Sequence, residues 1–133
     1  INQQVNRYLQ MMDFYINFTL DEEFNETVQS PIHEDFSYAS FSEGEKQRID
    51  LALLFTWREV AKFKNSVATN LMILDEVFDS SLDGQGTEEF LKIIRFVVKD
   101  ANIFVISHKS GMDDRFEDVI RFEKIKGFSR MVK

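Results

Sequence analysis

The chain has 133 residues, enough for one domain or part of one with a moderate hydrophobic core. Hydrophobic residues make up 44% of it and 14 residues are phenylalanine, a composition that excludes a disordered chain. The net charge of −7 is uneven, since residues 1–91 net −11 and residues 92–133 net +4. An acidic body disfavours broad contact with a phosphate backbone, so we expect any nucleic-acid contact to be local or supplied by another segment.

Three absences narrow the class further. There is no cysteine, which excludes disulfides and thiolate metal sites and fits a reducing cytoplasm. No apolar run approaches the roughly 18 residues of a membrane span, so we expect no membrane contact. The chain begins with Ile1 rather than Met, and we therefore expect it to be a piece of a longer protein.

The first predicted elements are a helix and a hairpin. Residues 1–13 carry apolar side chains at helical spacing, namely Ile1, Val5, Leu9 and Met12. Residues 14–20 are rich in β-formers, and residues 24–28 are their expected partner across an acidic turn. Residues 31–40 are typical of a loop.

A long helix is predicted to start near residue 42. Ser42 and Glu45 have the spacing of a capping box, in which each side chain satisfies a free backbone N–H of the first turn. The apolar residues that follow cover more than one face of the helix, which predicts substantial burial. They are Ile49, Leu51, Leu53, Leu54, Phe55, Trp57, Val60 and Ala61.

A strand–helix–strand unit comes next. Residues 71–74 and 103–106 are apolar runs that predict strands, and residues 87–98 predict the helix between them. The helix should turn Phe90, Ile93, Ile94 and Val97 inward. Both strands are apolar on both faces, as expected for a parallel sheet covered on both sides, and the crossover should be right-handed.

The tail predicts a short helix near residues 111–116. Two strands should follow, over residues 118–124 and 128–132, paired as a hairpin through Gly127. The expected fold class is therefore α/β, with a parallel sheet, flanking helices and a terminal β-hairpin.

Acidic residues and a histidine stand where the two predicted parallel strands end. Because ligands bind outside the carboxyl ends of such strands, Asp75, Glu76 and His108 should converge on one crevice suited to a magnesium-bound phosphoanhydride. Asp75 could hold Mg²⁺ directly or through water, and Glu76 could polarise an attacking water. His108 could bind the γ-phosphate or that water. The plainer alternatives are an exposed acidic strand end and a structural histidine.

The region around Ser42 is the second candidate site. A small residue, a hydroxyl and free backbone N–H groups at a helix N-terminus make an anion site, which the helix dipole reinforces. The capping box explains Ser42 and Glu45 without any ligand, so both interpretations stay open. A nucleophilic pair of Ser107 and His108 is disfavoured, because adjacent residues on an extended backbone point to opposite faces.

Four segments between residues 41 and 110 occur in a specific order, namely FSEGEKQR, LMILDE, SSLD and ISHK. This order resembles the signature motif, Walker B motif, D-loop and switch histidine of the carboxyl-terminal half of an ABC-type ATPase head, a P-loop NTPase. The form of the first segment is similar to that of the SMC-like DNA-repair branch. Within that branch it most resembles the ATPase subunits of phage recombination endonucleases, relatives of SbcC.

The resemblance implies a role for each matching residue. Asp75 would coordinate Mg²⁺, Glu76 would be the catalytic base, and His108 would contact the γ-phosphate of ATP. The signature residues would reach across a head-to-head dimer to the γ-phosphate held by the opposite protomer, and they are Ser42, Gly44 and Glu45. Ser81 and Asp83 would belong to the D-loop that bridges the two composite sites.

The chain departs from the family pattern in three ways. Glu43 replaces the usual small residue of the signature and puts a carboxylate beside an anionic ligand. The stretch from Glu76 to Leu82 is one residue longer than the common D-loop spacing. None of the five glycines opens a G-x-x-x-x-G-K-[ST] phosphate loop, so the chain alone should bind ATP weakly or not at all.

The resemblance also implies domains and partners. Residues 1–13 would end a coiled-coil arm, and residues 14–133 would be half of a head completed by an amino-terminal P-loop lobe of the same parent protein. The complete head would hydrolyse ATP, pair with a second head and control a calcineurin-like nuclease subunit on double-stranded DNA in the host-cell cytoplasm. The alternatives are a chromosome-condensation ATPase head and a non-catalytic docking or regulatory domain with an ABC-like fold.

Overall fold

The structure is a computed structural model that describes residues 1–29, 37–64, 70–79, 84–97, 99 and 101–132. Its helices are α1 (Asn2–Met11), α2 (Glu43–Lys64) and α3 (Gly84–Val97), with 3₁₀ turns at Tyr38–Ser40 and Asp113–Arg115. Its strands are β1 (Asn17–Leu20), β2 (Glu26–Gln29), β3 (Leu71–Asp75), β4 (Asn102–Ile106), β5 (Arg121–Ile125) and β6 (Phe128–Val132). They form three two-stranded pairs, of which β3–β4 is parallel and the other two are antiparallel.

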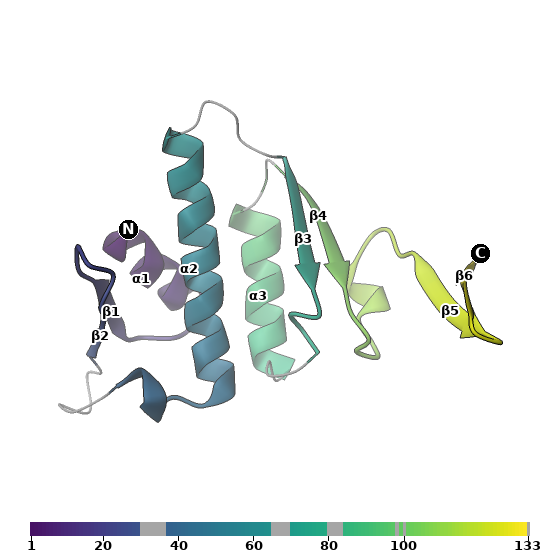
Figure 1. Cartoon of the computed structure of the whole chain (residues 1–133), viewed down its shortest axis with the longest axis horizontal. Coiled ribbons are helices and arrows are strands. Elements are labelled where there is room, and N and C mark those ends of the chain that lie inside the picture. The colour runs from purple at the N-terminus through teal and green to yellow at the C-terminus, as the bar shows by residue number, and fades with distance from the viewer. Residues whose placement is uncertain (30–36, 65–69, 80–83, 98, 100, 133) are drawn as a thin grey trace.

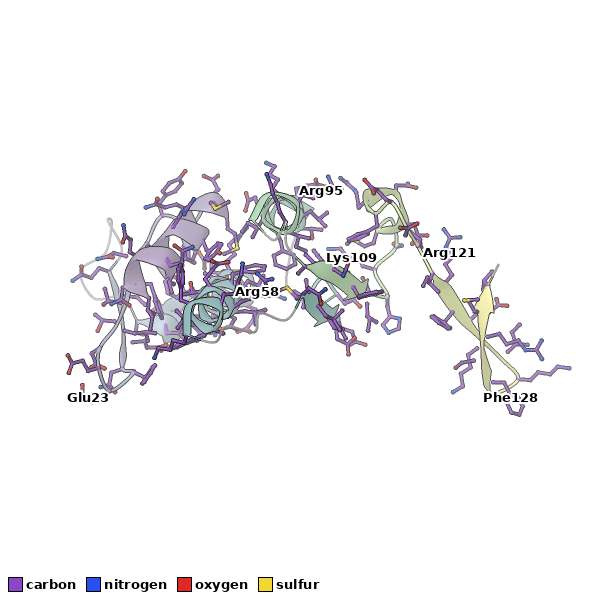
Figure 2. The ribbon with its side chains drawn as sticks, turned by 90° about the horizontal axis from the view of Figure 1, so that it is seen from above. Glu23, Arg58, Arg95, Lys109, Arg121 and Phe128 are labelled. Carbon is purple, nitrogen blue, oxygen red and sulfur yellow. The ribbon has the colours of Figure 1, made fainter. Side chains whose placement is uncertain are left out.

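The elements stand side by side in a row (Figure 1). α2 and α3 occupy the middle, with α1 and the β1–β2 hairpin on one side and the β3–β4 pair on the other. The β5–β6 hairpin projects away from the rest at the far end. Figure 2 shows Glu23 of the first hairpin and Phe128 of the last one at opposite ends of the molecule. The described part of the chain is therefore elongated.

Two asparagines of α1 pair with the backbone of β1. The Asn6 amide donates to the Phe18 carbonyl oxygen (2.7 Å) and accepts from the Phe18 N–H (2.8 Å). The Asn2 amide makes the same two bonds with Leu20, at 3.0 and 2.9 Å. Because Asn2 and Asn6 lie about one helical turn apart and Phe18 and Leu20 lie on one side of the strand, the two spacings match. These bonds fix α1 on the hairpin.

α2 begins at the predicted capping box, which is confirmed. The Ser42 N–H and hydroxyl both donate to Oε2 of Glu45 at 2.8 Å, and the Glu45 N–H donates to Oγ of Ser42 at 3.3 Å. The predicted burial of α2 is correct for only part of its surface, because Leu54 and Trp57 are exposed. The described neighbours of α2 cover only part of its circumference.

A row of aromatic rings joins the helices to the loop after β3. The ring centroids lie 5.5 Å apart for Tyr8 and Phe55, 5.8 Å for Phe55 and Phe90, and 4.9 Å for Phe90 and Phe78. All four side chains are buried. Burial of one such side chain contributes about 1.5–3 kcal/mol, so this row holds the loop after β3 firmly against α3.

The parallel pairing of the two apolar strands is confirmed, with Asp75 opposite Ile106. The prediction that both faces of this sheet are covered is wrong within the described residues, which cover one face only. Leu74 is buried on the face toward α3, whereas Ile73 is 60% and Phe104 55% exposed on the other. The physical reason is that the described chain supplies a covering helix to one face only.

Several element boundaries differ from the predicted ones. α3 begins at Gly84, three residues early, and β5 begins at Arg121, three residues late. The short helix of the tail is a 3₁₀ turn, and residues 31–36 of the predicted loop lie outside the described residues. The tail hairpin forms as predicted, but every residue of β5 and β6 is exposed. No helix in the described ranges is long and apolar enough to cross a membrane.

Candidate functional site

The turn after β3 carries the first candidate residues. The N–H of Glu76 donates to the Ile106 carbonyl oxygen at 2.8 Å and so extends the strand pairing by one residue. Glu76 itself has a φ of 54°, in the left-handed region. The Asp79 N–H then closes the turn on the Glu76 carbonyl oxygen at 3.1 Å. A left-handed non-glycine residue costs about 1–2 kcal/mol, and such residues cluster at functional sites.

The structure brings Glu76 and His108 together. Nε2 of His108 lies 3.2 Å from Oε1 of Glu76, and both side chains are exposed. Their contact follows from the parallel pairing of β3 and β4, because the carboxyl ends of both strands lie at the same edge. An imidazole N–H at this distance can donate to the carboxylate, which leaves the second carboxylate oxygen open to a water.

Asp75 is the last residue of β3 and is exposed. Its carboxylate makes no hydrogen bond or ion pair within the part of the chain that the structure describes. An open carboxylate at a strand end fits a hard divalent cation such as Mg²⁺, which takes oxygen ligands and keeps much of its water. The residue types present therefore fit the predicted metal, with Asp75 as its protein ligand.

A third carboxylate, Asp79, also lies at this edge. Glu76, Asp79 and His108 each place one possible ligand atom within 4.8 Å of the others. However, Asp79 already accepts hydrogen bonds from the Ser107 hydroxyl and, at 2.7 Å, from the His108 N–H. These bonds, the Ser107 one first, hold the pKa of the Asp79 carboxyl below its usual range. We therefore interpret this group as a hydrogen-bonded cluster rather than a metal site.

Sequence reasoning missed Asp79. It stands four residues after Asp75, between the predicted Walker B motif and the predicted D-loop. The available signal was Ser107, a polar residue at the end of the second parallel strand. Once a nucleophilic role was disfavoured, Ser107 had no assigned function, and a hydrogen-bond partner on the neighbouring turn was the remaining explanation. Ser107 and His108 do point to different partners, Asp79 and Glu76 respectively.

The predicted signature segment lies close to the same turn. Nε2 of Gln47, in the first turns of α2, donates to the carbonyl oxygen of Val77 at 2.5 Å. Ser42 is exposed and Gly44 half-buried at the start of the helix. Glu43 pairs with Lys46, with Oε1 and Nζ 2.8 Å apart, so its carboxylate is neutralised on the helix surface. The predicted D-loop residues Ser81 and Asp83 lie outside the described residues.

Comparison with solved structures defines the class of protein. No family model matches the sequence. The chain superposes on the SMC head domain from Thermotoga maritima with a TM-score of 0.72 and 26% identity, covering 99% of this chain and 46% of that one. An Smc head domain from Pyrococcus furiosus gives a TM-score of 0.73 at 18% identity, over 98% and 33% of the two chains. The predicted fold class, a lobe of an ABC-type ATPase head, is confirmed.

Two phage proteins match more closely in sequence. The chain is 50% identical over 131 residues to exonuclease subunit 2 of Enterobacteria phage T4, and 44% identical over 130 residues to exonuclease subunit 2 of Escherichia phage RB69. Each match covers 98% of this chain but only 23% of the phage protein. The resemblance to the ATPase subunits of phage recombination nucleases is confirmed over this segment.

Proposed function

We propose that this chain is the carboxyl-terminal lobe of an ATPase head in a DNA recombination and repair nuclease complex of phage type. The observation that carries the proposal is the 3.2 Å contact of His108 with Glu76 at the ends of two adjacent parallel strands. The identity to exonuclease subunit 2 supports the nuclease context. ATP hydrolysis in the complete head would control the nuclease.

The proposed chemistry is in-line attack of water on the γ-phosphorus of ATP. Glu76 accepts the proton of the attacking water as the bond to phosphorus forms and the bond to the ADP oxygen breaks. His108 orients the Glu76 carboxylate and contacts the γ-phosphate. Asp75 would hold Mg²⁺, which when bound supplies charge neutralisation between the phosphates. No covalent intermediate is required, since catalysis is by positioning and electrostatics.

The signature residues are proposed to serve a different nucleotide. Ser42, Gly44 and Glu45 of one head would face the γ-phosphate held by a second head, at the N-terminus of α2 where free N–H groups favour an anion. The Glu43–Lys46 pair supports this role, because it removes the net charge of the unusual carboxylate from the site. Ser81 and Asp83 are proposed as the D-loop on the resemblance of the segment SSLD alone.

An amino-terminal P-loop lobe of the same parent protein is the first proposed partner. The chain spans about a quarter of its phage relatives, and its parallel sheet is bare on one apolar face. α1 is proposed as the end of a coiled-coil arm, which would make residues 14–133 the head portion. A nuclease subunit is the second proposed partner, supported by the name of the phage relatives. Its calcineurin-like type, the double-stranded DNA substrate and the host cytoplasm are proposed on the sequence resemblance alone.

A chromosome-condensation head is the second candidate, favoured by the SMC fold relatives. The two candidates differ in their partner, because the repair complex predicts a copurifying nuclease subunit and the condensation complex a kleisin-type bridge. The higher identity to the phage subunits favours the nuclease complex. A docking domain without catalysis would show no ATPase activity even when the amino-terminal lobe is supplied.

The test is Glu76→Gln in the complete head. We expect ATP binding to remain while turnover falls by about a hundredfold or more, because loss of a general base typically removes that much rate. The ATP-bound dimer should accumulate. Glu22→Gln, in the exposed turn of the first hairpin, is the matched control. Unchanged turnover in Glu76→Gln would contradict its assignment as base.

A further inference from the structure

A carboxylate outside the predicted motifs joins the two loops of the site. One oxygen of Asp79, in the turn after β3, accepts from the Ser107 hydroxyl, and the other accepts from the His108 N–H at 2.7 Å. Ser107 and His108 follow Asp79 by 28 and 29 residues in sequence. Both carboxylate oxygens of Asp79 thus accept hydrogen bonds from the residues that follow β4.

We propose, on the basis of the proposed ATPase function, that Asp79 is a positioning residue that holds the His108 loop on the Glu76 turn. Through this clamp the His108 ring stays against the Glu76 carboxylate. Asp79 does not touch the nucleotide in this proposal. It acts through His108.

The strand pairing alone does not fix His108. The bond from the Glu76 N–H to the Ile106 carbonyl oxygen is the last backbone bond between the β3 and β4 segments in the described ranges. Beyond Ile106 the backbone leaves the sheet, and the His108 N–H finds its acceptor in Asp79. The backbone nitrogen of His108 lies two covalent bonds from Cβ, which carries the imidazole. Fixing this nitrogen therefore limits the positions that the imidazole can reach.

The clamp is anchored in the hydrophobic core. Asp79 follows Phe78, which is fully buried against Phe90 of α3 at a centroid distance of 4.9 Å. The Asp79 N–H is itself bonded to the Glu76 carbonyl oxygen at 3.1 Å. Asp79 is therefore fixed to the same turn as the proposed base, and His108 is fixed to Asp79.

The hydrogen-bond directions in the clamp are also determined. Ser107 donates its single hydroxyl proton to the carboxylate, and its oxygen accepts from the Lys109 N–H at 3.0 Å. Nζ of Lys109 lies 3.2 Å from Oγ1 of Thr87, near the start of α3. The loop after β4 is therefore bonded to the β3 turn through Asp79 and to α3 through Lys109. Loss of Asp79 should release Ser107 and His108, while the Lys109 contact remains.

The experiment compares Asp79→Ala, Asp79→Asn and Ser107→Ala with the wild type in the complete head. We expect Asp79→Ala to lower kcat for ATP by about tenfold to a hundredfold, because small misplacement of a reacting group has effects of that size. KM should change much less than kcat, since Asp79 itself does not contact the nucleotide and His108 makes only one of the contacts to it. Asp79→Asn keeps one acceptor and should lose less. Asp114→Ala, an exposed aspartate of the tail, is the control.

Two further readouts separate a positioning role from a general loss of structure. In a His108→Ala background, Asp79→Ala should cost almost no further kcat, because the residue through which it acts is gone. Independent effects that multiply in the double variant would overturn the proposal.

The hydrogen–deuterium exchange rate of the backbone amides of residues 105–110 should rise in Asp79→Ala and stay unchanged in Asp114→Ala. This measurement does not require the head to hydrolyse ATP. Unchanged exchange in Asp79→Ala would overturn the clamp. Faster exchange with unaltered kcat would overturn the positioning role. A wild-type head that fails to hydrolyse ATP would contradict the proposed function instead, while the exchange result would still decide whether Asp79 holds the loop.

Discussion

Ser42 shows how one side chain can have both a structural and a proposed catalytic role. Its hydroxyl and N–H close a capping box with Glu45, and it is also the proposed contact to the nucleotide of a second head. Both roles require the Ser42 side chain at the N-terminus of α2. The burial of Ser42 and its distance to Glu45 therefore do not show which role it has. A substitution that preserves one role and removes the other does.

We predict that Ser42→Asn in the complete head keeps its melting temperature near that of the wild type but lowers ATP turnover by at least about tenfold. Asparagine caps helices as well as serine does, but its longer side chain places its N–H donor at a different position from the serine hydroxyl. Ser42→Ala should additionally lose about 1 kcal/mol of stability as the cap is removed. Thermal unfolding and ATPase assays on the two variants decide the matter. Wild-type turnover in Ser42→Asn would limit Ser42 to the cap.

At this scale the sequence predicts local contacts well and distant ones poorly. The bonds between Ser42 and Glu45 follow from a spacing of three residues within one helical turn, and they form as predicted. The bond between Asp79 and Ser107 joins residues 28 positions apart. Its existence depends on the register of β3 against β4 and on the shape of two irregular turns. No residue pattern specifies that geometry.

Among the elements, the junction of α1 and β1 is the most specific. Asn2 and Asn6 satisfy both backbone groups of Leu20 and of Phe18, and Phe18 is fully buried. Removing such an amide would leave a partly buried N–H and carbonyl oxygen without their partner. Each unpaired group costs about 1–3 kcal/mol.

We predict that Asn6→Ala destabilises the protein by about 1–2 kcal/mol, because two partly buried backbone groups lose their partner. Asn17→Ala, on the exposed end of β1 where the amide makes a long 3.4 Å contact with Gln29, is the matched control. It should change stability by less than about 0.5 kcal/mol, as exposed substitutions usually do. Urea unfolding of both variants measures the difference. Equal midpoints would contradict a role for Asn6 in this junction.

The type and order of the elements could be predicted because each has a strong local signal. Apolar runs marked β3 and β4, helical spacing marked α1 and α3, and a glycine marked the last hairpin. Boundaries were less accurate, as at Gly84 and Arg121, because the ends of elements depend on neighbouring contacts. The predicted tail helix is a 3₁₀ turn of three residues, Asp113–Arg115, a segment too short for an α-helix.

For the whole molecule, the main feature is the apolar surface that the chain leaves uncovered. The outer face of the β3–β4 sheet exposes Leu71, Ile73, Phe104 and Ile106. An isolated pair of parallel strands with one bare face is unusual, because parallel sheets are normally covered on both sides. The sequence predicted strands suited to a covered sheet, but the covering segment could not be derived from this chain.

We predict that Phe104→Glu weakens association with the amino-terminal lobe when the two lobes are produced as separate chains. Burial of such a side chain contributes about 2 kcal/mol, so the dissociation constant should rise by about thirtyfold or more. Tyr15→Glu, which also changes an exposed aromatic but lies near the first hairpin, should have little effect. Isothermal titration calorimetry measures both. Equal affinities would place the lobe contact on another surface.

The bond from Gln47 to the Val77 carbonyl oxygen has a consequence for how two heads would communicate. In the proposed dimer, the start of α2 faces the nucleotide of the other head, whereas Glu76 acts on the nucleotide of its own head. Gln47 and Val77 are 30 residues apart in sequence, yet one hydrogen bond connects them. In that dimer each chain would contact two ATP molecules, one through the start of α2 and one through Glu76. The Gln47–Val77 bond would link these two parts of the chain, so a shift at one nucleotide would be felt at the other.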